Sequence, residues 1–262
     1  MKSKMKRVWL FAIMMYIAIG VNAYDTCING IYYLINSNGV WVTYRTTSGN
    51  SYSGDIVIPE TIKYNGFTYP VTKIYPGAFD SCTDLTSITF PSSITYIADT
   101  WYDCKNLTSI YITDLAAWLH ISLRDNLSLS NPLAANSLDH HIFLNGEEIT
   151  DLVIPNSVTK IRNKEFYYCS SLTSATISNS VTSIGENAFE GCTGLTSVTI
   201  PSSVTSIGYY AFKDCKSLNS ISIPEGVPWI SNGTFYGCNS LTSVTIPNSV
   251  RSINGYAFWE CI

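Results

Sequence analysis

Apolar and polar residues alternate in a pattern that recurs at a fixed interval through the second half of the chain. One unit has its apolar positions at Leu195, Val198, Ile200, Val204, Ile207, Ala211, Phe212 and Cys215. The alternation at its start predicts a short strand with Ser197 and Thr199 pointing outward. Pro201 ends that strand because it has no N–H to donate. The second apolar pair predicts a return strand, and the Ala-Phe pair predicts a short helical or 3₁₀ segment.

The cysteines mark the same period. Cys169, Cys192, Cys215, Cys238 and Cys261 follow one another in equal steps, and the step from Cys82 to Cys104 is shorter by one. Trp101 takes the place of the phenylalanine that precedes the cysteine in other units. Burial of six large side chains stabilises one unit by at most ~9–18 kcal/mol, whereas ordering its backbone costs ~23–46 kcal/mol. One unit therefore cannot fold alone, and the units must stack as a solenoid.

The spacing from Leu195 to Cys215 resembles that of the BspA-like leucine-rich repeats, also called the Treponema pallidum-type or LRR_5 class. The resemblance covers residues 62–262. It implies a leucine-rich repeat solenoid, rich in short parallel strands with turn or 3₁₀ segments, which is right-handed and curved and has its sheet on the concave side. The family resembled is one of extracellular adhesion and protein interaction.

Residues 1–23 are predicted to form a signal peptide. Basic residues up to Arg7 precede the apolar segment 8–19, and Val21-Asn22-Ala23 offers small residues for cleavage. The apolar segment is too short to span a ~30 Å hydrocarbon core, so we expect a chain secreted or displayed at the cell surface. The formal net charge is −4, and loss of four leading basic residues leaves 11 positive against 19 negative charges, or −8. Attraction to nucleic acid or to anionic lipid is therefore not expected.

Two regions depart from the repeat. Residues 24–61 are expected to form an N-terminal β cap with a hairpin over 31–35 and 40–44, and a separate binding module is the alternative. Residues 107–148 are an insertion in one long degenerate repeat, with a short helix capped by Asp114 and an Asn-Gly hairpin near residue 145. This insertion either buttresses the stack or projects from it to carry binding.

Candidate chemistry is sparse. Seven of the eight cysteines share one repeat position, where parallel side chains do not present disulfide geometry, so we predict reduced, buried thiols; Cys27 lies outside the ladder. His140 and His141 would face opposite sides of a strand, and no metal-ligand spacing is present. Nucleotide-binding and hydrolase motifs are missing as well. We therefore expect no catalytic residues, no metal and no cofactor.

Two surfaces are candidates for binding. The strand face presents small polar residues, with Tyr111 as its only aromatic residue. Near the Phe–Cys segment, Tyr102, Tyr167, Tyr236 and Trp259 share one repeat position, interrupted by Glu190 and Lys213. Stacked tyrosine and tryptophan side chains suit recognition of a partner, and packing of each ring on the neighbouring repeat is the alternative.

The predicted function is binding of an extracellular protein or glycan, with adhesion and without catalysis. A structural scaffold of the cell envelope is the alternative, and a glycan-processing enzyme is a remote one. The last repeat is incomplete at Cys261-Ile262. From that position we expect either a truncated reading frame or self-association through an uncapped C-terminal face.

Overall fold

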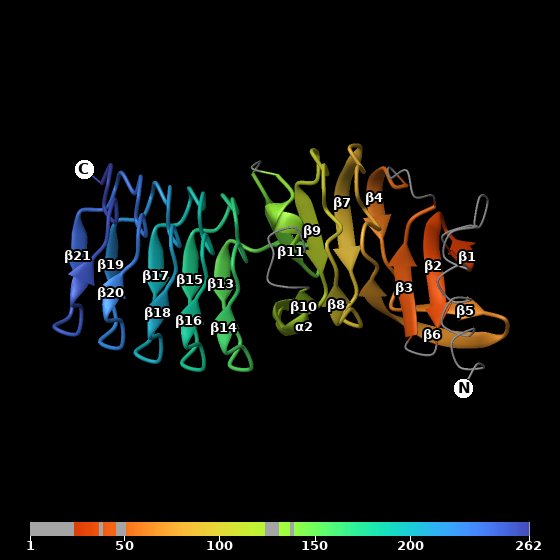
Figure 1. The fold of residues 1–262 in the computed structure, drawn as a ribbon, viewed down its shortest axis with the longest axis horizontal. Helices are drawn as coiled ribbons and strands as arrows, with labels where there is room; N and C mark the ends of the chain where they lie inside the picture. The colour runs from red at the N-terminus through yellow and green to blue at the C-terminus, as the bar shows by residue number, and fades with distance from the viewer. Residues whose placement is uncertain (1–23, 37–38, 46–50, 124–130, 137–138, 262) are drawn as a thin grey trace, which may run out of the picture.

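The computed structural model describes residues 24–36, 39–45, 51–123, 131–136 and 139–261. The predicted signal peptide lies outside the described residues. The chain forms an elongated stack of coils, with the N-terminal strands at one end and the last repeat at the other (Figure 1). No helix among the described residues is both long enough and apolar enough to cross a membrane.

The predicted first strand of each repeat is present, and these strands line up side by side as the first ladder. Their members are β4 (Gly54–Val57), β7 (Leu85–Phe90), β9 (Ser109–Ile112), β11 (His141–Leu144), β13 (Asp151–Val153), β15 (Ser174–Thr176), β17 (Ser197–Thr199), β19 (Ser220–Ser222) and β21 (Ser243–Thr245). Their mutual pairings are parallel, and in the regular region each residue opposes its equivalent in the next repeat, as Ser174 opposes Ser197. The period of the sequence is therefore the register of the sheet.

The predicted return strands form a second parallel ladder. Its members are β3 (Gly39–Thr43), β6 (Phe67–Ile74), β8 (Tyr96–Ile97), β10 (Ser122–Leu123), β14 (Lys160–Ile161), β16 (Ser183–Ile184), β18 (Ser206–Ile207), β20 (Trp229–Ile230) and β22 (Ser252–Ile253). The second residue of each short strand is an isoleucine or leucine, and it points toward the core in most repeats. The residue before it faces outward.

The third side of each coil is a run of turns that contains the phenylalanine and the cysteine. The expected short helical or 3₁₀ segment at Ala211-Phe212 is wrong, because the backbone there forms consecutive turns. The turns bond to the next repeat: the N–H of Phe189 donates to the carbonyl of Ala211 at 2.8 Å, and that of Phe212 to Thr234 at 2.9 Å. A helix would use these N–H groups within one repeat, whereas the stack uses them between repeats.

The core follows the axis of the stack. Phe166, Phe189, Phe212, Phe235 and Phe258 form a continuous pile, with successive ring centroids 5.2 to 5.6 Å apart and ring planes within 18° of parallel. Trp101 stacks on Phe79 at 4.8 Å, as its position in the repeat predicts. Each ring inside the pile is covered on both faces by the rings of the neighbouring repeats, so its burial depends on the stack.

The expected N-terminal hairpin is confirmed. Strand β2 (Ile31–Asn36) pairs antiparallel with β3 and with β1 (Thr26–Ile28). Strand β3 also pairs in parallel with β6, so the hairpin continues the second ladder. A further strand, β5 (Thr61–Tyr64), pairs antiparallel with β6.

The long repeat contributes its own elements to the stack. Helix α2 (Leu115–His120) begins as expected at Asp114, whose carboxylate accepts a hydrogen bond from the N–H of Ala117 at 2.9 Å. The short 3₁₀ helix η3 (Pro132–Ala134) follows β10, and the Asn-Gly turn joins β11 to β12 (Glu147–Glu148). Strand β11 pairs with β9 and β10 pairs with β8, so this segment occupies both ladders. The sheets end after it and resume at β13 and β14, and we call that boundary the seam.

Candidate functional site

The cysteines lie in single file beside the phenylalanine pile. All eight cysteines are free, as predicted for the seven of the ladder; the six from Cys82 to Cys238 are buried, and Cys261 is half-buried. Each thiol of the ladder from Cys192 onward donates to the backbone carbonyl of the phenylalanine one repeat earlier, at 3.1 to 3.2 Å, and Cys104 does the same to Phe79 at 3.0 Å. The cysteine is therefore a hydrogen-bond donor as well as a small apolar group, a role that sequence spacing did not reveal.

Burial also decides the chemistry of these thiols. It raises the pKa of Cys104 and the pKa of Cys238 each to about 12, and it holds the pKa of Cys215 well above its ordinary range. A thiol of that pKa is protonated at neutral pH and is a weak nucleophile. Cys27 is exposed on β1, outside this ladder. The ladder is consequently a structural element.

The predicted aromatic stripe lies on the outer side of the turns, which we call the turn face. Tyr102 and Trp259 are 64% and 56% exposed, whereas Tyr167 and Tyr236 are half-buried. As expected, Glu190 and Lys213 occupy the two positions between Tyr167 and Tyr236, where they form an ion pair at 2.7 Å. The aromatic residues at this position thus do not form one continuous stripe.

Some tyrosines on this face do pack on the next repeat, which was the alternative interpretation. The ring of Tyr210 lies over Gly233, where an added Cβ would come within 2.2 Å of the ring. Tyr168 covers Gly191 in the same way, with an added Cβ 2.8 Å from its ring. Glycine is required at both places because a neighbouring ring occupies the space of a side chain.

The last repeats gather the remaining rings into a C-terminal aromatic cluster, made up of Tyr210, Tyr236, Tyr256 and Trp259. Tyr256 is 63% exposed and meets Trp259 edge-on, with centroids 5.6 Å apart. The Lys213 ammonium lies 5.9 Å from the ring centroids of both Tyr210 and Tyr236. This cluster has the exposed aromatic anchors that binding surfaces use.

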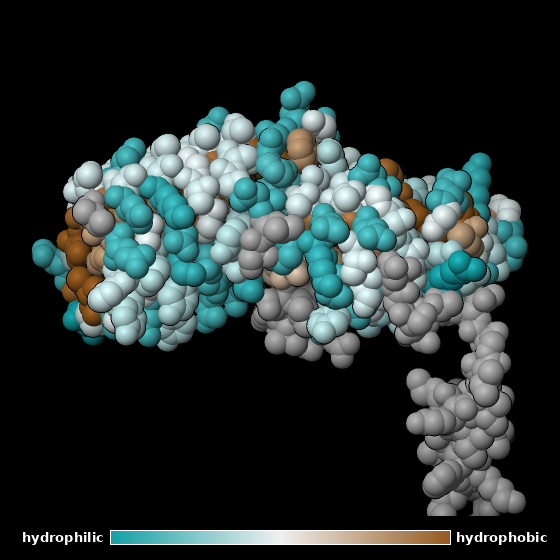
Figure 2. All heavy atoms as spheres, turned by 90° about the horizontal axis from the view of Figure 1, so that it is seen from above, coloured by the Kyte–Doolittle hydropathy of each residue, from teal (hydrophilic) through white to brown (hydrophobic). Residues whose placement is uncertain are grey.

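The end of the stack beyond this cluster is apolar. Figure 2 shows hydrophobic side chains gathered at the C-terminal end, over an otherwise mostly polar surface. Ile246 and Ile253 are exposed there, on or beside the last strands β21 and β22.

The strand face differs from the expectation at one place. Tyr111 is half-buried, and it is not the only aromatic residue on that face, because β11 brings Phe143 beside it. The two rings stack with centroids 4.5 Å apart and planes 13° from parallel. Next to them the Nδ1 atom of His141 contacts the Oε1 atom of Glu148 at 2.5 Å. The expectation is wrong because residues 141–144 belong to a repeat strand as well as to the Asn-Gly hairpin.

Many serine and threonine hydroxyls bond to the backbone of the preceding repeat. Thr196 donates to the carbonyl of Thr173 at 2.9 Å, and Ser203 donates to that of Val181 at 2.8 Å. Thr173 and Ser180 make the equivalent bonds one repeat earlier. These hydrogen bonds link successive repeats next to the strands, a role that the sequence pattern alone did not indicate.

Sequence reasoning missed the outward positions of the second ladder, which we call the second strand face. Its column consists of Trp41, Lys73, Tyr96, Ser122, Lys160, Ser183, Ser206, Trp229 and Ser252. Lys73 lies 5.0 Å from the ring centroid of Trp41, and Trp229 is 48% exposed. The signal in the sequence is the single residue before each inward isoleucine or leucine, which is serine in most regular repeats and an aromatic residue in a few others.

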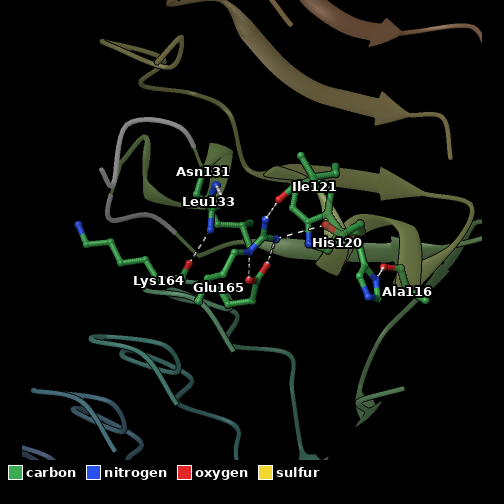
Figure 3. A network of polar contacts seen from close by, with 9 residues as sticks. Ala116, His120, Ile121, Asn131, Leu133, Lys164 and Glu165 are labelled. Atoms are coloured by element: carbon green, nitrogen blue, oxygen red, sulfur yellow. Dashed lines mark hydrogen bonds and ion pairs between the residues drawn. The ribbon is translucent and has the colours of Figure 1, made fainter. Parts of the chain in front are cut away.

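A buried ion pair lies at the seam, and its arginine reaches across it. Arg162 bonds through two nitrogens to the buried carboxylate of Glu165, with Nη2 at 2.6 Å from Oε1. The same guanidinium donates to the backbone carbonyls of Trp118, at 3.2 Å, and of Ile121. Figure 3 shows this network of polar contacts, with Ile121 at the end of α2 and Glu165 in the first regular repeat. Arg162 therefore bonds the Ile121 carbonyl at the end of α2 and adds a second donor to the Trp118 carbonyl, which also accepts from the N–H of Ile121.

Other polar contacts at the seam are of the same kind. The amide of Asn131 donates to the carbonyl of Lys164 at 2.8 Å, and the His120 ring contacts Ser157 O at 3.1 Å. His140 is buried, and its Nδ1 atom donates to the carbonyl of Tyr167 at 2.8 Å. His140 points inward while its neighbour His141 lies on the strand face, and no three His, Cys, Asp or Glu side chains of the described residues gather where they could hold a metal ion.

Comparison with known proteins identifies the class of repeat. The family described as "BspA type Leucine rich repeat region" matches the chain in six copies, over residues 17–121 and 136–262. This chain therefore belongs to the BspA-type leucine-rich repeat family, and its β-rich stack of short parallel strands is the repeat fold of that family. The match also covers residues 24–61, which depart from the regular apolar spacing.

The chain is similar to several solved structures, among them those of three bacterial leucine-rich repeat proteins. A protein from Bacteroides ovatus is 21% identical, with 91% of this chain and 93% of that chain covered and a TM-score of 0.39. The T. pallidum leucine-rich repeat protein is 23% identical over 87% and 85%, with a TM-score of 0.40. A leucine-rich cell surface protein from Faecalibacterium prausnitzii is 22% identical over 90% and 86%, with a TM-score of 0.39. No curated protein matches the chain.

Proposed function

We propose that this protein is exported to the cell surface and binds a partner protein through its C-terminal aromatic cluster, without catalysing a reaction. Membership of the BspA-type repeat family supports a surface or protein-binding role. The observation that carries the proposal is the exposure of Tyr256 and Trp259, which contact each other at one edge of the turn face.

The physical reason lies in the nature of these side chains. Tyrosine and tryptophan offer a large apolar area together with a hydrogen-bonding group, and they lose few rotamers on binding. The hydroxyl of Tyr236 approaches Glu260 Oε1 at 3.5 Å, so a polar rim adjoins the rings. A rigid stack presents this arrangement preformed, which lowers the entropic cost of association.

A structural scaffold of the cell envelope is the competing function. The free, buried cysteines and the uniform repeats would serve a scaffold equally well. The two functions differ in where the chain lies and in what removal of the aromatic rings would do. A scaffold inside the envelope would be protected from protease added to intact cells, and a surface binding protein would be cleaved.

The test is retention of extracellular matrix proteins, mucins and bacterial cells by the immobilised chain, measured for the wild type and for Trp259→Lys. Lysine is chosen because Lys213 holds the same repeat position, so the stack accepts it. We expect the wild type to retain at least one of these probes and Trp259→Lys to lose roughly tenfold in affinity, since one tryptophan anchor contributes about 1.4 kcal/mol or more.

Trp229→Ser is the matched control, because it removes an exposed tryptophan from the second strand face and not from the cluster. It should leave retention of the protein probes unchanged. Retention of none of the probes, or equal loss in both variants, would contradict the proposed binding surface.

A further inference from the structure

The second strand face is hollowed into a groove of about 400 Å³ across β14, β16, β18 and β20. Its floor is made of small residues, with Ser183, Gly185, Ser206 and Gly208 in successive repeats. The glycines are required by the stack itself, since a Cβ on Gly208 would lie 2.6 Å from the backbone of Glu186. The volume falls within the ~300–1,000 Å³ typical of sites for small ligands.

Aromatic side chains form the C-terminal wall of this groove. Trp229 stands where the two repeats before its own have Ser183 and Ser206. Tyr209, one repeat earlier in the chain, stands where the two repeats before its own have Asn163 and Glu186. Both rings are 48% exposed although both belong to interior repeats, so their exposure does not result from the end of the stack. Two large, half-exposed rings thus lie beside a floor of small residues.

The polar groups of the floor are available to a ligand. In the same repeats, Ser180, Ser203 and Thr205 donate to backbone carbonyls of the neighbouring coil. Within the described part of the chain, the hydroxyls of Ser183 and Ser206 form no hydrogen bond with the protein. The groove therefore offers a row of hydroxyl groups next to two aromatic faces.

The charges of the groove nearly cancel. Lys160 and Glu186 are exposed side chains of opposite sign, and the guanidinium of Arg162 is neutralised by Glu165. An ionic ligand would gain little from such a site, and an apolar one would leave the hydroxyls without partners. In the middle of the floor, β16 pairs with β14 on one side and with β18 on the other, so its backbone groups are already bonded within the sheet.

We propose that this groove binds a short, uncharged oligosaccharide. A sugar ring has C–H faces that stack on aromatic rings and an edge of hydroxyls that both donate and accept hydrogen bonds, which is the combination that Trp229, Tyr209 and the serine row present. The groove continues past Lys160 into a second hollow of about 270 Å³, lined by His120 and Ser122, so the site has room for a chain of sugar rings. This site is separate from the aromatic cluster proposed to bind protein.

The experiment is a binding screen of the full chain on immobilised neutral oligosaccharides of glucose, galactose, mannose and N-acetylhexosamines. It is followed by titration of tryptophan fluorescence with the oligosaccharides that are retained. Three variants are compared with the wild type. Trp229→Ser and Tyr209→Asn each restore a residue that other repeats carry at that position, and Trp259→Lys removes a ring from the aromatic cluster. Circular dichroism confirms that each variant is folded.

We expect at least one neutral oligosaccharide to bind, with affinity reduced roughly tenfold in Trp229→Ser and Tyr209→Asn, and unchanged in Trp259→Lys. Absence of binding to every oligosaccharide would overturn the proposal, as would binding that both groove variants retain in full. Loss of protein retention in Trp259→Lys tests only the proposed function. Either proposal can therefore be contradicted while the other stands.

Discussion

The two halves of the stack, on either side of the seam, are stabilised in different ways. In the C-terminal half, from β13 onward, every repeat has the same length, and equivalent residues oppose one another wherever its strands pair. In the N-terminal half the register steps vary: Asp55 opposes Ser87, which opposes Ser109, which opposes His141. The regular half uses the same residue contacts in every repeat, whereas the irregular half depends on contacts that each occur at one place in the stack.

The contacts in the two halves show what this difference means. The C-terminal half repeats the same phenylalanine contact and the same thiol hydrogen bond in each coil. The N-terminal half packs Phe90 against both Trp101 and Trp118, and the seam depends on Arg162 and Glu165. We therefore expect removal of one contact to cost less stability in the regular half, where neighbouring repeats make the same contact, than at the seam, where no other residues replace it.

The largest expected effect is a loss of stability at alkaline pH, and we expect this loss to be greatest in the C-terminal half. Its buried cysteines have a raised pKa, so an unfolded chain ionises them above about pH 9 while the folded chain keeps them protonated. Stability is complete below that pH and falls as the pH rises toward 12, by up to about 1.4 kcal/mol per pH unit for each thiol. Urea denaturation at pH 8 and pH 10 measures the loss.

The matched variants are Cys192→Ala, which removes one buried thiol, and Cys27→Ala, which removes the exposed one. Cys192→Ala should reduce the difference in unfolding free energy between the two pH values, and Cys27→Ala should not. An equal difference in all three proteins would show that the ladder is not the source of the pH dependence.

The next effect concerns the seam. Arg162→Gly places at that position the glycine found in the following repeats, and it leaves the Glu165 carboxylate buried without its partner. We expect a loss of about 3–5 kcal/mol in unfolding free energy, since an uncompensated buried charge is costly. The double variant Arg162→Gly/Glu165→Ala, which matches Gly185 and Ala188, should regain a large part of that loss. A double variant no more stable than the single one would show that the loss does not come from an unpaired buried carboxylate.

A smaller effect distinguishes ring packing from backbone strain. Gly233→Ala adds a Cβ that meets the Tyr210 ring, at a backbone φ of 60°, whereas Gly54→Ala adds one at a φ of 65° with nothing within 4 Å. Both incur the strain of a left-handed alanine, about 1 kcal/mol. Gly233→Ala should lose a further ~1–3 kcal/mol from the clash. Thermal unfolding compares the two, and equal losses would mean that Tyr210 is not packed on this glycine.

The repeat itself could be predicted from the sequence because its apolar spacing is nearly invariant. The strands, the cysteine ladder, the place of Trp101 and the cap at Asp114 all follow from that spacing and from local rules. The turn segment at Ala211-Phe212 could not be predicted correctly. The N–H of Phe212 bonds to the next coil, whereas sequence signals for a helix describe hydrogen bonds within one segment.

The surfaces were less predictable for the same reason. Tyr111 meets Phe143 only because β11 joins the ladder out of the regular period. Arg162 and Glu165 stand where other repeats have glycine and alanine, and such departures from the repeat are the signal that could have found the seam. The groove needs Trp229 and Tyr209 together, and these lie in different repeats.

The central claim is that the cysteines form one buried file of free thiols along a single stack. The most direct measurement is the reaction of the native chain with a thiol-specific reagent, followed by its reaction in denaturant. The structure predicts rapid modification of Cys27, slower modification of the half-buried Cys261, and modification of the other six only after unfolding, for a total of eight. A total below eight in denaturant without reductant, or rapid modification of all the cysteines in the native chain, would contradict the account.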